Sequence, residues 1–376
     1  MKTNRLGLYA HIPFCERKCN YCDFVSFTGK DEKDFKKYID ELLKEIKDRG
    51  SEDYHVDSLY IGGGTPSILP SNLMERLLRK AYDSFKLTKD LEVTIEVNPA
   101  TVDKEKLNSY RSLGINRISM GVQSFDDTIL KKLGRIHSKK DVTDSYNLIR
   151  KAGFNNVSMD LMYAVPGQSE ALWEESLKEA VLLEPEHISC YSLSLEEGTD
   201  FYDSFNKGTL KLPSYDEDVK MYLITGELLS KAGYHRYEIS NYCKGGYASR
   251  HNLKYWNMEE YLGLGVSAHS FINGVRIENH HTLNEYYGRE KVKSTHKNTE
   301  YDNISEFIFM GLRKTEGISL KDFEDRFSIP YNVYLKDRQD ILKALIDQGF
   351  ILEEEGRIKY TLKGILGSNR ITIDLM

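Results

Sequence analysis

Residues 8–22 read LYAHIPFCERKCNYC, and this stretch decides the fold. An apolar, strand-like run ends at Ile12. The loop that follows it holds three cysteines, Cys15, Cys19 and Cys22. Three thiolates from one short loop can hold three corners of an iron–sulfur cube, and the fourth iron is then left without a protein ligand. The spacing C-x3-C-x2-C therefore predicts a cluster site with one open iron.

Two other interpretations of the cysteine loop are a zinc site and three unrelated cysteines. His11 or Asp23 would complete a zinc site. Structural zinc sites normally draw their ligands as two separated pairs, whereas this loop offers one triplet, which favours the cluster. The chain has five cysteines in all, an odd number, and this argues against a disulfide framework. Cys190 and Cys243 are expected to be core or incidental residues.

Short β-rich runs alternate with helical patterns over the first 233 residues. The expected strands are Leu6–Ile12, Val56–Ile61, Leu91–Val97, Ile115–Val122, Asn155–Met162 and His187–Leu195. The expected helices are Asp34–Lys47, Asn72–Phe85, Lys104–Leu113, Lys139–Ala152, Ala171–Leu182 and Asp216–Ala232. Six strand–helix units predict an α/β fold with a parallel sheet covered by helices. Because a full barrel needs eight units, we expect a partial, three-quarter βα barrel, with an open doubly wound sheet as the alternative.

The alternation stops near residue 234, and this divides the chain into three predicted parts. Residues 1–233 are the barrel, and residues 234–300, rich in Gly, Asn, His and Tyr, are a bridging segment. Residues 301–376 combine helical patterns with a hairpin at Glu355-Gly356, which is typical of a winged-helix-like α+β domain. The helical patterns cover 303–312, 320–327 and 333–348. The last of these balances basic and acidic residues, so we expect no nucleic-acid binding.

The composition is that of an ordinary globular protein. Of 376 residues, 40% are hydrophobic and 29% are charged, and the net charge is −6. A mildly acidic chain without basic runs argues against nonspecific binding to nucleic acid or to anionic membranes. No run of 18 apolar residues is present, and the N-terminus lacks the apolar core of a signal peptide. The expected location is therefore cytoplasmic.

Polar residues follow the ends of the expected strands. The run Gly62-Gly63-Gly64-Thr65-Pro66 follows the second strand, and its glycines let a ligand approach the backbone closely. Parallel sheets bind ligands at the carboxyl ends of their strands. One buried carboxylate is usually a paired structural residue, but several polar groups at successive strand ends predict a ligand pocket. These further residues are Glu96, Gln123, Arg135 and Asp160.

The stretch from Leu8 to Cys22 closely resembles the radical S-adenosylmethionine (SAM) superfamily. More narrowly, it is similar to the group that contains oxygen-independent coproporphyrinogen III oxidase and related heme chaperones, and the resemblance extends over nearly the whole chain. It implies a [4Fe–4S] cluster on Cys15, Cys19 and Cys22, with SAM chelating the open iron. It also implies an electron donor such as flavodoxin or ferredoxin, whose electron splits SAM into methionine and a 5′-deoxyadenosyl radical.

The resemblance also implies which residues contact SAM. The acids and Gln123 are expected to hold the ribose hydroxyls and the amine, while Arg135 balances charge. The implied SAM-contacting residues are Tyr9, Gly63, Gly64, Thr65, Glu96, Gln123, Arg135 and Asp160.

Two departures distinguish this chain from the oxidase branch of the group. Phe24 stands where the oxidases carry a further cysteine, and the oxidases have a longer extension before the cysteine loop. Residues 251–256, HNLKYW, instead match the HNxxYW motif of the heme chaperone branch. An imidazole such as that of His251 can ligate heme iron, and the rings of Tyr255 and Trp256 can stack on a porphyrin.

The resemblance therefore implies a heme chaperone that binds the cluster, SAM and heme and passes heme to acceptor proteins. Membrane-bound clients could recruit such a protein to a membrane surface. The alternative is an oxygen-independent coproporphyrinogen III oxidase that forms protoporphyrinogen IX by hydrogen abstraction from propionate side chains. Radical chemistry on another substrate is a third reading, and whether the chain is an enzyme stays open at this point.

Overall fold

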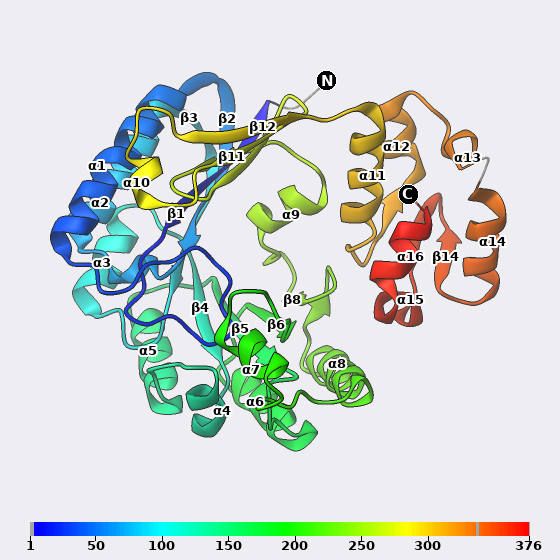
Figure 1. The fold of residues 1–376 in the computed structure, drawn as a ribbon, viewed down its shortest axis with the longest axis horizontal. Helices are drawn as coiled ribbons and strands as arrows, with labels where there is room; N and C mark the ends of the chain where they lie inside the picture. Colours follow the sequence, from blue (N-terminus) through cyan, green and yellow to red (C-terminus); the bar gives the residue numbers. More distant parts are fainter. Residues whose placement is uncertain (1–3, 336–337, 376) are drawn as a thin grey trace.

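The computed structural model describes residues 4–335 and 338–375, and its centre is a curved twelve-stranded sheet (Figure 1). Six parallel strands, adjacent in chain order, form the middle of this sheet. They are β1 (Arg5–Ile12), β2 (Ser51–Gly63), β3 (Phe85–Val97), β4 (Arg117–Gln123), β5 (Val157–Tyr163) and β6 (His187–Ser192).

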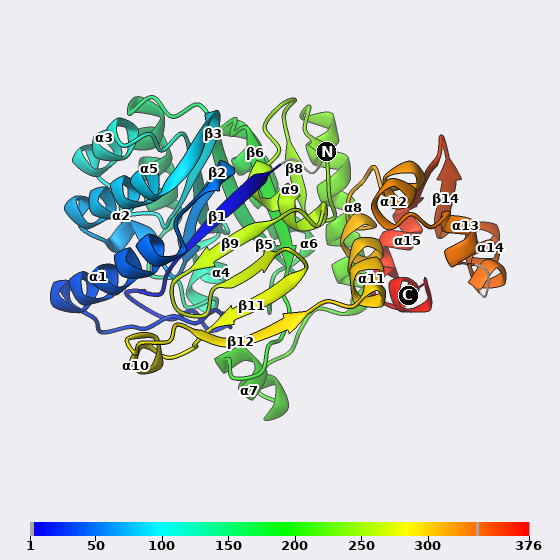
Figure 2. The same ribbon diagram turned by 90° about the horizontal axis from the view of Figure 1, so that it is seen from above.

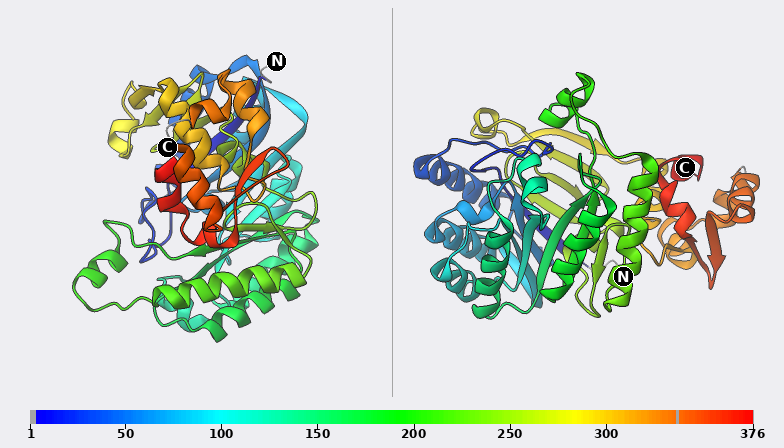
Figure 3. Two further views of the ribbon diagram at one scale, coloured as in Figure 1. Left: turned by 90° about the vertical axis from the view of Figure 1, so that its right-hand side faces the viewer. Right: turned by 90° about the horizontal axis from the view of Figure 1, so that it is seen from below.

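Helices cover the outer face of the parallel strands, as Figures 1 and 3 show. They are α1 (Glu32–Arg49), α2 (Ser71–Ser84), α3 (Lys104–Ser112), α5 (Lys139–Lys151), α6 (Glu170–Leu182) and α8 (Tyr215–Lys231). The connections also contain η1 (Pro66–Ile68), α4 (Asp127–Lys132) and α7 (Asp200–Asn206). Six strand–helix units with their helices on one side confirm the predicted partial βα barrel.

Local signals in the sequence set the ends of these helices. Asp31 caps α1 by accepting hydrogen bonds from the backbone of Lys33 and Asp34. At the other end of α3 and α5, Gly114 and Gly153 adopt φ values of 88° and 86°. This left-handed conformation is easy for glycine and stops a helix.

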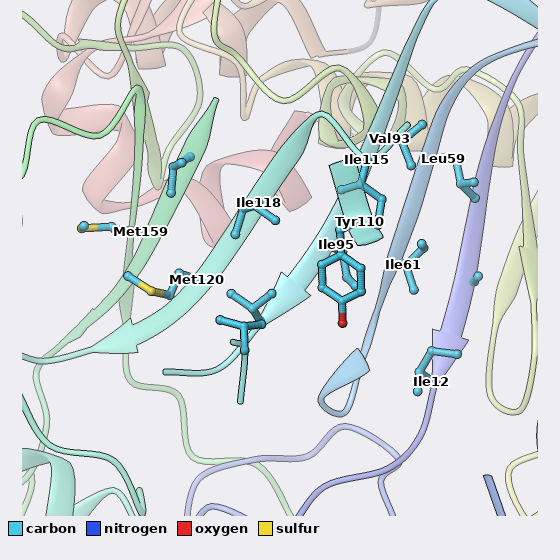
Figure 4. Close-up of a cluster of buried hydrophobic side chains, with 14 of the residues drawn as sticks. Ile12, Leu59, Ile61, Val93, Ile95, Tyr110, Ile115, Ile118, Met120 and Met159 are labelled. Carbon is cyan, nitrogen blue, oxygen red and sulfur yellow. The ribbon is translucent and has the colours of Figure 1, made fainter. Parts of the chain in front are cut away.

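The barrel core lies between the strands and the covering helices. Figure 4 shows apolar side chains of β1 to β5 packed there, including Ile61, Ile95 and Ile118, none of which is exposed to solvent. From the helices, Leu78 of α2 and Tyr110 of α3 are equally buried. One face of each strand therefore packs beneath the helices, and the opposite face lines the interior of the barrel.

The segment from residue 234 to residue 300, which we predicted as a bridging segment, extends the sheet at both edges. Figure 2 shows β9 to β12 continuing the sheet beyond β1. β9 pairs parallel to β1, the next three strands are antiparallel, and β8 pairs antiparallel to β6. Most of these strands are short and half exposed, so they lack the apolar run that marks a central strand. They are β7 (His235–Arg236), β8 (Asn241–Cys243), β9 (Tyr261–Leu264), β10 (His269–Ile272), β11 (Val275–Asn279) and β12 (Val292–Lys297), with α10 (Leu283–Tyr286) before the last.

The remaining residues form a small module with its own core, built around Ile308, Phe323, Ile351 and Ile358. Its antiparallel sheet has the order β13-β15-β14. This α+β arrangement agrees with the predicted winged-helix-like domain, and the hairpin turns at Glu355-Gly356 as expected. The elements are α11 (Glu300–Gly311), β13 (Ile318–Ser319), α12 (Leu320–Phe327), α13 (Tyr331–Tyr334), α14 (Gln339–Asp347), β14 (Ile351–Glu354), β15 (Arg357–Tyr360), α15 (Leu362–Leu366) and α16 (Ser368–Leu375).

One helix predicted in this module is divided in the structure. The pattern over 333–348 predicted a single helix, whereas α13 ends at Tyr334 and α14 begins at Gln339, with residues 336 and 337 outside the described part of the chain. Across the described residues, no helix is both long enough and apolar enough to span a bilayer.

Candidate functional site

The carboxyl ends of the parallel strands open onto a cavity of about 510 Å³. The cavity lies between these strand ends and the cysteine loop, so residues that are far apart in sequence meet there. Ten of the eleven residues predicted to hold the cluster or SAM line it: Cys15, Cys19, Cys22, Gly63, Gly64, Thr65, Glu96, Gln123, Arg135 and Asp160.

Tyr9 is the one predicted contact that does not line this cavity. Its hydroxyl lies 3.0 Å from Nδ1 of His11, and its ring lies beside that of Tyr60. Nε2 of His11 lies 3.0 Å from the carbonyl oxygen of Val25. Both ring nitrogens of His11 therefore have partners, so His11 does not offer the fourth ligand that the zinc interpretation needed. The contact of Tyr9 with SAM stays a prediction.

The cysteine loop is anchored to the barrel on two sides. Near β1, the backbone N–H of Phe27 donates to Pro13, and that of Cys15 donates back to Phe27. Near α4, the side chain of Asn20 donates to the carbonyl oxygen of Lys132 at 2.8 Å. These bonds fix the loop across the mouth of the cavity.

The thiols at the cavity mouth are partly buried. Burial raises the pKa of the Cys15 thiol, and it raises the pKa of Cys22 to about 11. A bound metal must therefore drive their deprotonation. A single zinc ion needs every donor about 2.3 Å from one point, whereas each thiolate of a cubane binds a different iron. Among the residues described, no three His, Cys, Asp or Glu side chains are grouped for one ion. The cysteine arrangement fits a cluster better than zinc.

A chain of hydrogen bonds connects two of the three thiols. The hydroxyl of Thr65 lies 3.5 Å from Sγ of Cys15 and accepts a bond of 2.9 Å from the amide of Asn98. The Asn98 oxygen accepts from Arg135 at 2.7 Å, and the other end of that guanidinium lies 3.6 Å from Sγ of Cys19. Donors of this kind stabilise thiolates and tune a cluster. The sequence analysis did not select Asn98, although it lies two residues beyond Glu96 in an Asn-Pro pair.

The two carboxylates of the cavity have different surroundings. Glu96 accepts hydrogen bonds from the hydroxyl of Tyr60 at 2.9 Å and from the backbone of Gly63 at 3.0 Å. Burial nevertheless raises the pKa of Glu96 to about 7.

Asp160 accepts from three serine hydroxyls, two of which come from neighbouring strands. The bonds measure 2.8 Å from Ser119, 3.2 Å from Ser158 and 2.6 Å from Ser189. Sequence analysis also missed these serines. No local pattern marks them, because Ser119 and Ser158 are the only serines of β4 and β5, and the two serines of β6 lie three residues apart.

Glycine is required where β2 meets the cysteine loop. A β-carbon on Gly64 would lie 2.6 Å from the carbonyl oxygen of Phe14, and one on Gly63 would lie 2.5 Å from the ring of His11. Gln123 is also unusual, since it is not a glycine but adopts a φ of 64° at a bulge in β4. Left-handed backbone of this kind is found at sites where a side chain must be aimed.

The HNxxYW motif forms helix α9 (Arg250–Trp256), which packs on the inner side of β2. The ring of His251 is 1% exposed, its Nδ1 lies 3.0 Å from the hydroxyl of Ser58, and its Nε2 lies 2.9 Å from that of Tyr255. Burial lowers the pKa of His251 to about 3. Both ring nitrogens therefore have partners in this conformation. To ligate iron, the imidazole would have to give up one of them.

The other aromatic residues of the motif face different neighbours. Tyr255 packs edge-on against Tyr261 of β9, with ring centres 4.6 Å apart. Trp256 lies beneath the guanidinium of Arg313 at 5.2 Å, and its buried indole N–H has no hydrogen-bond partner within the described part of the chain. The motif thus connects the interior of the barrel to the C-terminal module, and its contact with heme stays a prediction.

A parallel partial barrel with a three-cysteine loop across its strand ends defines a class: this is a radical SAM protein. The model of the radical SAM superfamily matches residues 9–180, and that of the HemN C-terminal domain matches residues 298–366. The fold is also that of coproporphyrinogen III oxidase (HemN) from Escherichia coli, with a TM-score of 0.86. That match covers 98% of this chain and 89% of the oxidase at 24% identity, and therefore shows the fold alone.

Sequence comparison narrows the class to a family. The heme chaperone HemW of Bacillus subtilis is 37% identical, over 96% of this chain and 97% of that protein. The heme chaperone HemW of Lactococcus lactis is also 37% identical, over 96% of this chain and 95% of that protein. The chain belongs to the HemW family. Membership in the radical SAM superfamily implies a [4Fe–4S] cluster and SAM, and the donors around the cavity fit both.

Proposed function

We propose that this protein is a cytoplasmic heme chaperone on a radical SAM scaffold, which binds heme and transfers it to acceptor proteins. The observation that carries this proposal is the match, over nearly the full length of the chain, to relatives named heme chaperone HemW. The HNxxYW helix supports it, because His251, Tyr255 and Trp256 offer an imidazole and two aromatic rings within seven residues.

We propose that different residues of the cavity bind the cluster and SAM. Cys15, Cys19 and Cys22 would hold the cluster, and Thr65 and Arg135 would donate hydrogen bonds to its sulfur ligands. When reduced, a cluster of this class supplies an electron to SAM.

The ligand-binding roles follow from charge and hydrogen-bonding capacity. The backbone of Gly63 and Gly64 would approach the methionyl group, since neither residue has a side chain in the way. Glu96 would accept from the ammonium group, and Gln123 and Asp160 would bind the ribose hydroxyls. A flavodoxin- or ferredoxin-like protein is the proposed electron donor, and membrane-bound clients are proposed acceptors. The parts 1–233, 234–300 and 301–376 are proposed as barrel, bridging segment and C-terminal domain.

Heme binding is tested by titrating anaerobically reconstituted protein with heme and following the Soret band. We expect saturable binding, and we expect His251→Ala to change the band while Tyr247→Ala, as a control outside the motif, does not. Transfer is then tested by adding the apoprotein of a cytoplasmic or membrane hemoprotein and following its own heme spectrum. Wild-type protein that shows no saturable heme spectrum would refute the proposal.

The oxidase alternative is tested on the same preparation. Wild-type protein with reductant, SAM and coproporphyrinogen III should form no protoporphyrinogen IX under anaerobic conditions. Phe24, which is 62% exposed and lines the cavity mouth, supports this expectation, because it stands in place of the additional cysteine. Formation of the decarboxylated product would favour the oxidase.

A further inference from the structure

Arg117 is a buried cation that no residue of the described chain pairs with. It is the first residue of β4, it is 1% exposed, and it lines the same cavity as the predicted SAM site. Its guanidinium forms no hydrogen bond or ion pair within the part of the chain that the structure describes, and its Nε is buried without a partner. An unpaired buried charge destabilises a fold. The burial of Arg117 is therefore explained only if a group that is not part of the folded chain pairs with its charge.

The carboxylates of the barrel interior, Glu96 and Asp160, do not pair with Arg117. Burial raises the pKa of Glu96, and the positive charge of Arg117 offsets a small part of that rise, so the two groups attract each other across the cavity. The oxygens of Glu96 are nevertheless bound to Tyr60 and Gly63, and those of Asp160 are bound to serines. Attraction at a distance offsets part of the cost of burial, but it leaves the N–H donors of Arg117 unused.

Two other polar groups at this end of the barrel also lack partners. Thr94 lies opposite Arg117 in the register of β3 and β4, and its buried hydroxyl makes no hydrogen bond to any residue that the structure describes. Asn252 of α9 lines the cavity, and its side-chain amide has no hydrogen-bond partner among the described residues. Both ring nitrogens of the nearby His187 already have hydrogen-bond partners, because the hydroxyls of Ser158 and Tyr237 each lie 2.8 Å from one of them.

The position of Arg117 separates it from the cluster end of the cavity. β4 runs seven residues from Arg117 to Gln123, which is about 20 Å at about 3.3 Å per residue. The methionyl carboxylate of SAM is expected at the far end, beside the cysteine loop and Arg135. Arg117 therefore faces the part of the barrel that lies beyond the SAM site.

We propose that Arg117, assisted by Asn252, binds a carboxylate group of a second ligand that enters the barrel beyond SAM. A guanidinium presents two parallel N–H groups that match a carboxylate, and an amide N–H can donate a further bond to it. Naming that ligand rests on the proposed function: heme carries two propionate groups, so one propionate is assigned to Arg117. SAM is the other molecule at this site with a carboxylate.

The test compares heme with heme dimethyl ester, which lacks both negative charges. Reconstituted wild-type protein, Arg117→Met, Arg117→Lys and the exposed control Arg79→Met are titrated with each compound, and SAM is titrated separately by calorimetry. We expect Arg117→Met to weaken heme binding at least tenfold, Arg117→Lys to weaken it less, and neither to change the affinity for the ester or for SAM. The proposal would be overturned if Arg117→Met weakened the binding of heme and of its dimethyl ester equally, or if it weakened the binding of SAM alone.

Two further measurements keep the result interpretable. Without ligand, Arg117→Met should melt at the same temperature as wild-type protein or higher, because an unpaired buried charge is removed; a fall of several degrees would show a structural role and contradict the proposal. If wild-type protein binds neither heme nor its ester, the heme chaperone proposal fails separately. The carboxylate site is then tested with sodium propionate, which should raise the melting temperature of wild-type protein but not that of Arg117→Met.

Discussion

Glu96 is a carboxyl group of the site whose charge changes near neutral pH. Burial raises its pKa from an ordinary value of 4.5 to about 7, so the folded protein holds this proton more tightly than the unfolded chain does. The stability that comes from this difference is complete below about pH 4.5 and is lost as the pH rises through about 7.

We therefore expect Glu96→Gln to stabilise the cluster-free protein relative to wild type as the pH rises. The difference in melting temperature, variant minus wild type, should grow between pH 5 and pH 8, because only wild type then carries the buried charge. Thermal unfolding across this range measures it, with the exposed Glu75→Gln as a control for the loss of one carboxyl. A difference that is flat with pH would contradict the assignment of the raised pKa to Glu96.

Asn98 connects Thr65 to Arg135 by hydrogen bonds. Replacing Asn98 therefore tests the role of the hydrogen-bonded chain between the thiols of Cys15 and Cys19. We expect Asn98→Ala to weaken SAM binding about tenfold or more, since a hydrogen bond to a charged group contributes about 1.5–3 kcal/mol. Iron and acid-labile sulfide should stay at the wild-type level, because the three cysteines are untouched. Calorimetry and iron analysis on the same sample test both statements. Unchanged SAM affinity would show that Asn98 only supports the loop.

Single residues of the site could be predicted only where a pattern marked them. Cys15 and its two partners occur at a diagnostic spacing, and Gly63 follows a strand directly. Asn98 and the serines around Asp160 carry no such mark, because an isolated polar residue at the end of a strand is common in any sheet. Their roles depend on which strands become neighbours, and that is a property of the folded chain.

At the scale of elements, helix α9 packs closely against β1 because residue 7 is a glycine. A β-carbon on Gly7 would lie 2.7 Å from Cδ of Lys254 and 3.3 Å from the ring of His251. Lys254 has little room to move, because it is 3% exposed and its ammonium lies 2.8 Å from Asp57. The absence of a side chain at residue 7 thus lets α9 lie directly against β1.

We expect Gly7→Ala to displace α9 and to destabilise the protein. Overpacking of this kind costs about 1–3 kcal/mol, which corresponds to a fall in melting temperature of roughly 2–4 °C per kcal/mol for a domain of this size. Gly245→Ala is the matched control, because its new β-carbon would meet nothing within 4 Å and its backbone is not left-handed. A variant Gly7→Ala that melts like wild type would show that α9 is not held in this way.

The elements that sequence analysis found and those it missed differ in their physical origin. β1 to β6 are apolar runs followed by helices with caps such as Asp31 and terminators such as Gly153, so local chemistry specifies them. β12 has the sequence VKSTHK, with five of its six residues exposed. It is a strand because β11 pairs with it, and no local signal encodes that pairing. The position of α9 inside the barrel has the same non-local origin.

At the scale of the whole molecule, the C-terminal module contacts the barrel through the end of α9. Arg326 of α12 donates to the carbonyl oxygens of Asn257 and Met258 at 3.2 Å and 2.8 Å. Lys314 reaches the side chain of Asn257 at 2.7 Å, and Arg313 covers Trp256. Since α9 also packs beside the cavity, this contact places the module one helix away from the proposed ligand site.

We expect Arg326→Met to loosen this contact without changing the SAM site. Two carbonyl groups at the end of α9 would lose their donor, so amide hydrogen exchange should quicken in residues 253–258 and in α12, whereas β1 to β6 should exchange as in wild type. SAM affinity should stay within twofold, because no SAM-binding residue is altered. Arg79→Met, which changes an exposed helix residue that pairs with Glu75, is the control. Faster exchange throughout the barrel would instead mean that the module stabilises the entire fold. Unchanged exchange in α9 would mean that the remaining contacts, which include Lys314 and the Arg276–Glu306 ion pair, hold the module without Arg326.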